Sequence, residues 1–174
     1  IKKLSAELTR QICAGEIVVR PISIVKELVE NSLDAKADHI KIHVSNGGKT
    51  MITIEDNGCG MNLNDLKLCL DQHATSKLEN LWNIHTLGFR GEALHAISSV
   101  ADIEIDTTYT KSQNTIYNDQ DMQTHNTGNK LVSKNGNRIF SESKPRIGTK
   151  ITVCNILHNV PVRLKFLKSD YIEW

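Results

Sequence analysis

The chain has 174 residues, of which 39% are apolar and 24% charged, and its formal net charge is +1. These values are typical of one globular domain with a hydrophobic core. The 21 basic and 20 acidic side chains give no support for a strongly basic nucleic-acid-binding surface. No apolar run approaches the length of a transmembrane helix, no signal peptide is visible, and the four cysteines form no C-x-x-C pair. We therefore expect an intracellular protein with reduced thiols and no membrane association.

The segment Pro21–Ala35, PISIVKELVENSLDA, has the periodicity of an amphipathic helix. Its expected core face consists of Ile22, Val25, Leu28, Val29 and Leu33. On the polar face Glu27 and Asn31 are one turn apart, so both side chains can point at the same object. An amide oxygen suits Mg²⁺, and a carboxylate beside it is suited to take a proton from water. The alternative interpretation is an ordinary solvated helix face.

A β-hairpin is expected after this helix. Residues 39–45 alternate between polar and apolar, Asn46-Gly47-Gly48 forms a turn, and Ile52 and Ile54 resume the alternation. The second strand runs into the glycine-bearing loop E-D-N-G-C-G-M, residues 55–61. Such a loop lets a ligand approach the backbone, and Asp56 is suited to accept a hydrogen bond from the exocyclic amine of a purine. The alternative is a plain D-N-G turn.

Two further segments are suited to bind anions. Asn62 is expected to cap a helix that reaches about Gln72, with Leu63, Leu66 and Leu70 facing inward. The sequence HATSK, residues 73–77, follows it and places small hydroxyl side chains beside a lysine, which suits phosphate oxygens. Residues 78–86 have no firm pattern and are interpreted as a lid. GFRGEAL, residues 88–94, then enters an apolar helix whose N-terminus attracts anions, and no Walker P-loop occurs.

The remaining elements are mostly strands. Residues 102–108 alternate as a strand, and the polar segment 109–129 is interpreted as a long excursion. Residues 130–141 are expected to form a hairpin that turns at Asn135-Gly136, and residues 148–153 a final strand. This order favours an α+β fold: a two-layer sandwich with helices on one face of a mixed, mostly antiparallel sheet.

The chain resembles the MutL family of DNA mismatch-repair ATPases, within the GHKL superfamily, in the order and approximate spacing of five motifs. These are KELVENSLDA (Lys26–Ala35), DNGCGM (Asp56–Met61), HATSK (His73–Lys77), GFRGEAL (Gly88–Leu94) and GTKITV (Gly148–Val153). The combination of HATSK with GFRGEAL is specific, because gyrase, the heat-shock chaperone and the histidine kinases share only the Glu/Asn helix and a D-x-G-x-G loop. The resemblance implies the GHKL, or Bergerat, ATPase fold.

The resemblance also implies a role for each motif. Glu27 would be the general base that activates water, and Asn31 would bind both the nucleotide and Mg²⁺. Asp56 would accept the adenine amine, and Thr149 would help to fix the base. The pocket around the base would be shaped by Gly58, Gly60 and Met61. The phosphates would be contacted by Thr75, Ser76, Lys77, Gly88, Arg90, Gly91, Glu92, Ala93 and Leu94. Glu30 is expected to be structural.

For the complete protein, the resemblance implies a Mg-ATP-dependent switch. ATP would drive N-terminal dimerisation, as a homodimer or heterodimer, and slow hydrolysis would reset a clamp on DNA that couples a MutS-type recognition protein to strand removal.

Residues 1–157 would be the ATP-binding domain and 158–174 the start of a transducer domain. A lysine that in the family reaches the γ-phosphate from that domain is absent, so we expect weak or no hydrolysis by this chain. The location would be cytoplasmic in bacteria, which the motif details favour, or nuclear in eukaryotes. The alternatives are a binding-only switch and another GHKL enzyme, such as a kinase or a topoisomerase subunit.

Overall fold

The computed structural model describes residues 20–74, 92–110, 127–160 and 167. Its elements in chain order are α2 (Pro21–Asp34), β1 (Ile40–Ser45), the short 3-10 helix η1 (Asn46–Gly48), β2 (Met51–Asp56), α3 (Leu63–Leu68), α4 (Ala93–Val100), β3 (Asp102–Thr107), β4 (Gly128–Lys134), β5 (Asn137–Ser143) and β6 (Thr149–Cys154). The expected lid at 78–86 and most of the excursion at 109–129 lie outside the described residues. None of the described helices is long and apolar enough to cross a membrane.

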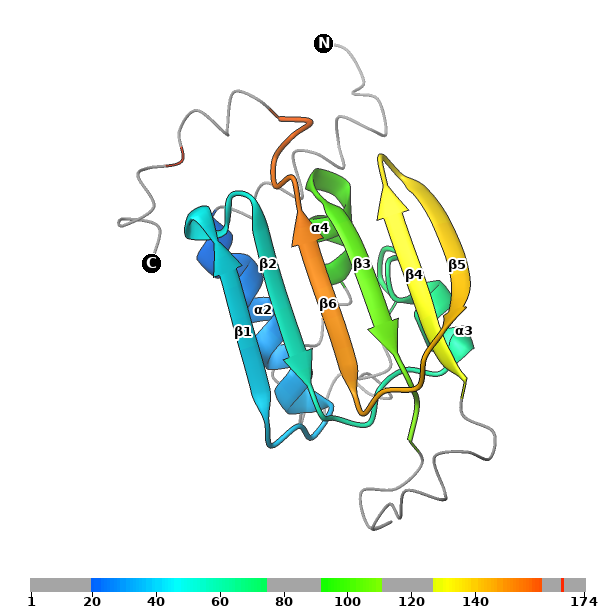
Figure 1. The fold of residues 1–174 in the computed structure, drawn as a ribbon. Coiled ribbons are helices and arrows are strands. Elements are labelled where there is room, and N and C mark those ends of the chain that lie inside the picture. Colours follow the sequence, from blue (N-terminus) through cyan, green and yellow to red (C-terminus); the bar gives the residue numbers. More distant parts are fainter. Residues whose placement is uncertain (1–19, 75–91, 111–126, 161–166, 168–174) are drawn as a thin grey trace, which may run out of the picture.

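The strands form one six-stranded sheet in the order β1-β2-β6-β3-β4-β5, and all five of its pairings are antiparallel. Figure 1 shows α2, α3 and α4 on the same face of this sheet. The expected α+β sandwich is therefore confirmed. Because β6 is inserted between β2 and β3, the start of β6 lies beside the ends of both of these strands. This insertion brings residues from distant parts of the chain to one end of the sheet.

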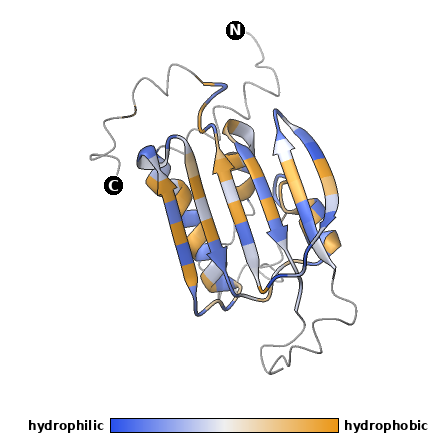
Figure 2. Cartoon of the chain, in the orientation of Figure 1, coloured by the Kyte–Doolittle hydropathy of each residue, from blue (hydrophilic) through white to orange (hydrophobic). Residues whose placement is uncertain are grey.

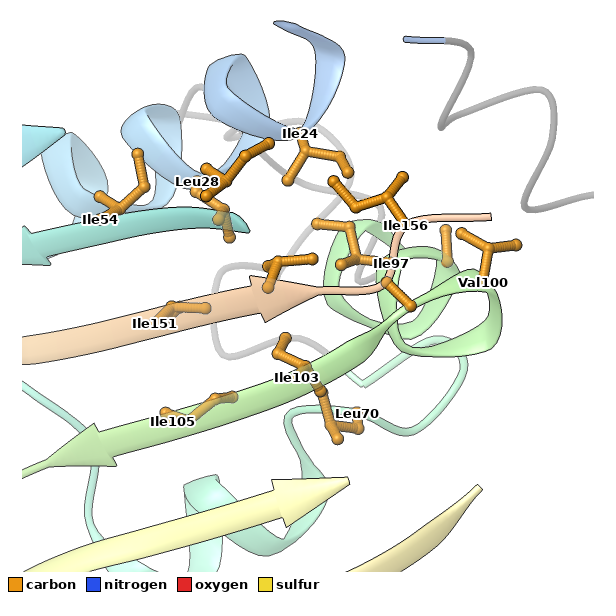
Figure 3. Packing of buried hydrophobic residues seen from close by; sticks show 14 of the residues in the cluster. Ile24, Leu28, Ile54, Leu70, Ile97, Val100, Ile103, Ile105, Ile151 and Ile156 are labelled. Carbon is orange, nitrogen blue, oxygen red and sulfur yellow. The ribbon is translucent and has the colours of Figure 1, made fainter. Parts of the chain in front are cut away.

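The hydrophobic core lies between the sheet and the helices. Inward-facing residues of the central strands, such as Ile54 and Ile105, meet Leu28 of α2 and Ile97 of α4, and these side chains are at most 2% exposed. Figure 3 shows how these side chains gather between the two layers. The strands alternate between hydrophobic and hydrophilic residues, as Figure 2 shows, because successive side chains point to opposite faces of the sheet. Each fully buried Ile or Leu contributes about 1.5–3 kcal/mol to folding, which makes this cluster the main source of stability.

The sequence correctly placed α2 but misplaced part of its core face. Ile22 and Leu33 were expected to be buried, yet they are 38% and 46% exposed. Val25 and Leu28 are buried as expected, and they are joined by Pro21, Ile24 and Ser32, which were not expected on the core face. The helix carries apolar residues around more than half of its circumference, so periodicity alone does not locate the line that meets the sheet.

The cap of α3 is as expected, but one of its core residues is not. The Asn62 side chain accepts a hydrogen bond from the Asp65 backbone N–H at 2.9 Å. Leu66 and Leu70 are fully buried, whereas Leu63 is 42% exposed. α3 itself ends at Leu68, before the expected Gln72, with Cys69 as its C-cap.

Candidate functional site

Asp56 is the hydrogen-bonding centre of one end of the sheet. It is the last residue of β2, and its Oδ1 accepts hydrogen bonds from the backbone N–H groups of Gly58, at 2.9 Å, and of Thr149, at 3.2 Å. Its Oδ2 lies 3.0 Å from the hydroxyl oxygen of Ser32 on α2. The carboxylate therefore joins β2 to the loop that follows it, to β6 and to α2, which fixes its orientation.

The contact with Ser32 leaves Asp56 able to accept a further hydrogen bond. The buried Ser32 hydroxyl is also 3.1 Å from the carbonyl oxygen of Leu28. A hydroxyl has one hydrogen and both neighbours are acceptors, so it can donate a full hydrogen bond to only one of them at a time. When Ser32 donates to the Leu28 carbonyl, the lone pairs of Asp56 Oδ2 remain available for a donor from outside the protein. Ser32 was not predicted at this site, although a small hydroxyl residue within an apolar helix face is a signal for such a contact.

Glu27 and Asn31, the two polar residues singled out on α2, both lie half-buried on the same side of the helix. They are one turn apart, as predicted, and Asn31 directly precedes the residue that contacts Asp56. Helical spacing thus places the Glu27 carboxylate and the Asn31 amide along one side of α2, while Ser32, on the buried side of the helix, contacts Asp56. Glu30 instead forms an i,i+4 ion pair with Lys26, with 3.6 Å between Nζ and Oε1, which agrees with a structural role.

The loop after β2 is held against neighbouring backbone on both sides. The Cys59 N–H donates to the carbonyl of Ala35 at 3.0 Å, and the Cys59 carbonyl accepts from Thr110 N–H at 2.9 Å. A Cβ atom on Gly58 would lie 2.7 Å from the Ala35 carbonyl oxygen, which is too close. Gly60 has φ +68° and its added Cβ would overlap the carbonyl of Thr108. The close packing of this loop therefore requires both glycines, and the positive φ of Gly60 is a second reason for glycine there.

A second hydroxyl group lies beside Thr149. Thr107 and Thr149 are directly opposite each other on β3 and β6, and their hydroxyl oxygens are 2.9 Å apart. The Thr107 hydroxyl also accepts a hydrogen bond from the Met61 N–H at 3.0 Å. Thr149 and Met61 were predicted at this site from the sequence, but Thr107 was not. The sequence did contain a signal for Thr107. In the alternating pattern of β3 it falls on the same buried face as Ile103 and Ile105, where an apolar residue would be usual.

Just before β6, Gly148 makes the close approach of the strands possible. It has φ +70°, and an added Cβ would overlap the carbonyl oxygen of Asp56. The Gly148 carbonyl accepts from the Thr108 N–H at 3.3 Å, which ties the start of β6 to the end of β3. The absence of a side chain at Gly148 therefore lets β6 reach Asp56.

The structure describes only one end of each of the two motifs that are predicted to bind anions, HATSK and GFRGEAL. His73 and Glu92 come together, with 3.5 Å between Nδ1 and Oε1, which joins the start of HATSK to the end of GFRGEAL. Glu92 precedes α4 and its carbonyl accepts from Ala96 N–H at 2.8 Å, while Ala93 begins the helix and Leu94 packs against the core. The other predicted phosphate contacts lie outside the described residues: Thr75, Ser76, Lys77, Gly88, Arg90 and Gly91.

Residues 20–74, 92–110 and 127–160 contain no group of three or more His, Cys, Asp or Glu side chains placed to hold a metal ion.

Comparison with known proteins gives the class of the chain. Residues 19–149 match the model of the family described as "Histidine kinase-, DNA gyrase B-, and HSP90-like ATPase". The chain therefore belongs to this ATPase family, and the expected GHKL fold is confirmed.

Within this class the similarity is to MutL proteins. The chain is 44% identical to DNA mismatch repair protein MutL of Lactococcus lactis and 46% identical to that of Pasteurella multocida, over 99% and 100% of its length. It spans only 25% and 27% of those two relatives. Among solved structures, it is similar to the Aquifex aeolicus MutL ATPase domain complexed with ADP, with TM-score 0.66, 27% identity and coverage of 90% of this chain and 51% of that one. The N-terminal domain of a DNA repair protein is also similar, with TM-score 0.67, 30% identity and coverage of 90% and 42%. The resemblance predicted from the motifs is therefore confirmed.

Proposed function

We propose that this chain is the ATP-binding module of a MutL-type mismatch-repair protein. The observation that carries the proposal is Asp56, an oriented carboxylate with a lone pair to spare at the end of β2, in contact with Ser32 of α2. The bound ADP of the similar Aquifex aeolicus domain supports the same ligand class here. In this assignment Asp56 accepts a hydrogen bond from the adenine amine, and Thr149 helps to hold the base. The pocket wall around the base is formed by Gly58, Gly60 and Met61.

Mg²⁺ and the phosphates are assigned to the polar side of α2 and to the two anion-binding motifs. The amide oxygen of Asn31 is a hard donor of the kind that Mg²⁺ prefers, and phosphate and water would supply its other ligands. The bound ion neutralises phosphate charge. Glu27, one turn away, acts as the general base toward the attacking water. The phosphate contacts are assigned to Thr75, Ser76, Lys77, Gly88, Arg90, Gly91, Glu92, Ala93 and Leu94.

The proposal extends to the longer protein of which such a module would be part. ATP binding drives dimerisation with a second MutL-type subunit, and slow hydrolysis resets a clamp on DNA. The partners are DNA and a MutS-type recognition protein, and the setting is the cytoplasm of a bacterium, because the similar MutL proteins come from bacteria. Residues 1–157 form the ATP-binding domain and residues 158–174 begin the next domain.

The test is calorimetric binding of ADP, and of a non-hydrolysable ATP analogue with and without Mg²⁺. Asp56→Asn keeps an Oδ1 acceptor for the two backbone N–H groups but replaces Oδ2 by a donor, so it should weaken both ligands by roughly 10- to 100-fold. Asn31→Ala should remove the part of the analogue affinity that depends on Mg²⁺. Asp106→Asn is the matched control, because Asp106 lies near the end of β3 and bonds to the Ser143 hydroxyl, at 2.7 Å from Oδ1. Unchanged ADP affinity in Asp56→Asn would contradict the proposal.

A further inference from the structure

Three polar side chains form a row across the central strands at the end of the sheet. They are Asp56 on β2, Thr149 on β6 and Thr107 on β3, all on the face that the helices cover. Thr107 is fully buried and Thr149 is 6% exposed. A fully buried hydroxyl on a core face is costly unless its hydrogen bonds are made, so the direction of each bond can be followed.

The Thr107 hydroxyl has one hydrogen to give and three neighbours. The N–H of Met61 is a donor at 3.0 Å, so Thr107 accepts that bond. The remaining neighbours are the Gly148 carbonyl oxygen at 3.3 Å and the Thr149 hydroxyl oxygen at 2.9 Å. The Gly148 carbonyl already accepts from the Thr108 N–H, so it does not need a second donor. The shorter bond, from Thr107 to Thr149, is therefore the better destination for the hydrogen.

The direction of this hydrogen bond determines whether the Thr149 hydroxyl acts as a donor or as an acceptor toward a ligand. A threonine hydroxyl that accepts from one side keeps its own hydrogen for another acceptor. We propose that Thr107 is a positioning residue for base recognition: it donates to Thr149 and thereby leaves the Thr149 hydroxyl as the donor to the ring nitrogen N1 of adenine. This inference rests on the proposed function. A bridging water would transmit the same polarity, because it accepts from Thr149 and donates onward.

The resulting order of acceptor and donor fits adenine and opposes guanine or hypoxanthine. Asp56 accepts from the amine at position 6, and the Thr149 hydroxyl donates to N1. A 6-oxo purine presents an acceptor at position 6 and a donor at N1, so both contacts would be mismatched. Thr107 therefore contributes to base selectivity although it does not touch the base.

A purely structural role for Thr107 predicts a different result. The same hydroxyl holds the Met61 N–H and lies against the Gly148 carbonyl, so its loss could simply loosen the loop after β2. In that case all adenine-like ligands would bind more weakly by the same factor. The two roles are separated by 1-deaza-ADP, in which a C–H group replaces N1 and only the contact with the Thr149 hydroxyl is lost.

The experiment measures the ratio of the dissociation constants of 1-deaza-ADP and ADP by calorimetry, on the 174-residue chain and its variants. The wild type should prefer ADP by about five- to tenfold, the value of one hydrogen bond. Thr107→Val should lower this preference to roughly twofold, and Thr107→Ser, which keeps the hydroxyl, should restore it. Thr108→Val is the matched control: its hydroxyl is equally buried and accepts from the Arg146 N–H at 3.0 Å, so its ratio should equal that of the wild type.

Each outcome decides the inference. If Thr107→Val has the same ratio of the two dissociation constants as the wild type, the inference is overturned, even when both ligands bind more weakly. If Thr107→Val does not fold, Thr107→Ala, which also lacks the hydroxyl, gives the decisive ratio: a value near twofold supports the inference, and a wild-type value overturns it. Failure of the wild type to bind ADP at all would refute the proposed function itself, whereas wild-type binding of ADP and 1-deaza-ADP with equal affinity would refute only the inference.

Discussion

Gly60 occupies a position where both the backbone conformation and a neighbouring carbonyl exclude a side chain. Its φ is +68°, and a Cβ atom would overlap the Thr108 carbonyl oxygen. Gly136, in the β4–β5 turn, has a similar φ of +80° but nothing within 4 Å of an added Cβ. We predict that Gly136→Ala costs about 1 kcal/mol in the free energy of unfolding, from backbone strain alone. Gly60→Ala should cost more than about 3 kcal/mol, because the strand end must also move.

Urea unfolding of the two variants measures this difference, and ADP calorimetry adds a second readout. Gly60→Ala should also lose ADP affinity, since the loop that it distorts begins at Asp56. Gly136→Ala should bind ADP like the wild type. Equal unfolding free energies for the two variants would show that the loop after β2 can move to accommodate a methyl group at Gly60, which would contradict its close packing against the Thr108 carbonyl.

The thiol of Cys69 predicts a loss of stability at alkaline pH. Burial raises its pKa from 9.0 to about 12, and its sulfur lies 3.2 Å from the Leu66 carbonyl oxygen. Above pH 9 the unfolded chain releases this proton while the folded chain keeps it, so the stabilisation present below pH 9 is lost as the pH rises toward 12. Between pH 8 and pH 10 the wild type should lose about 1 kcal/mol more unfolding free energy than Cys69→Ala. Equal losses in urea titrations at the two pH values would contradict this prediction.

At the scale of the element, α2 connects the core to the site. Leu28 is 1% exposed and packs into the core, and its carbonyl oxygen lies within hydrogen-bonding distance of Ser32. We predict that Leu28→Ala lowers the unfolding free energy by about 2–5 kcal/mol, because it leaves a cavity beneath the helix. Leu33→Ala removes the same atoms from a side chain that is 46% exposed, so it should cost less than about 1 kcal/mol. Thermal unfolding of the pair measures the contrast, and similar costs would mean that the two sides of the helix are equally packed.

The contrast between these two leucines shows which features of the fold can be predicted from the sequence and which cannot. The bounds of α2 and the turns at Asn46–Gly48 and Asn135-Gly136 follow from local chemistry, namely a helix-starting proline and residues that tolerate positive φ. The choice between Ile22 and Ile24 as a core residue depends on where the sheet lies, which is a tertiary fact. The insertion of β6 between β2 and β3 is likewise invisible to periodicity.

The site divides in the same way. Asp56 and the glycines after it were predictable, because an acid at a strand end before a glycine loop has a local pattern and a family resemblance. Ser32 and Thr107 were missed, because each becomes relevant only when folding brings it within 3.0 Å of its partner from another element. Polar residues on an expected core face are the signal that would have indicated both.

At the scale of the whole molecule, the two faces of the sheet differ in kind. One face is covered by the helices and buries the core, and on the other face charged side chains join distant segments. Glu55 of β2 lies 3.4 Å from the Lys150 ammonium of β6 and 3.3 Å from the Arg146 guanidinium of the preceding loop. Lys150 is directly opposite Glu55 in the strand register. This cluster therefore ties the two strands together on the face away from the core.

The protonation of Glu55 should make part of the stability depend on acid pH. Burial acts to raise the pKa of Glu55, but Lys150 and Arg146 more than offset it, so the pKa lies below its ordinary value of 4.5. The folded state then binds fewer protons than the unfolded state, and the stabilisation is present above pH 4.5 and is lost as the pH falls through the lower, folded pKa. Because the side chain is 39% exposed, we predict that Glu55→Gln lowers the unfolding free energy at pH 7 by only about 0.5 kcal/mol.

Urea unfolding at several pH values tests this dependence. The difference between wild type and Glu55→Gln should shrink steadily below pH 4.5, and at pH 7 it should shrink in 1 M salt, which screens exposed charges. Glu30→Gln is the control, because it removes the same charge from a single pair with Lys26, whose side chain is 69% exposed, and joins no strands. If the Glu55→Gln difference persisted undiminished in acid and in high salt, its origin would be packing of the glutamate stem, and the ion pairs on the open face would contribute nothing measurable to the alignment of β2 with β6.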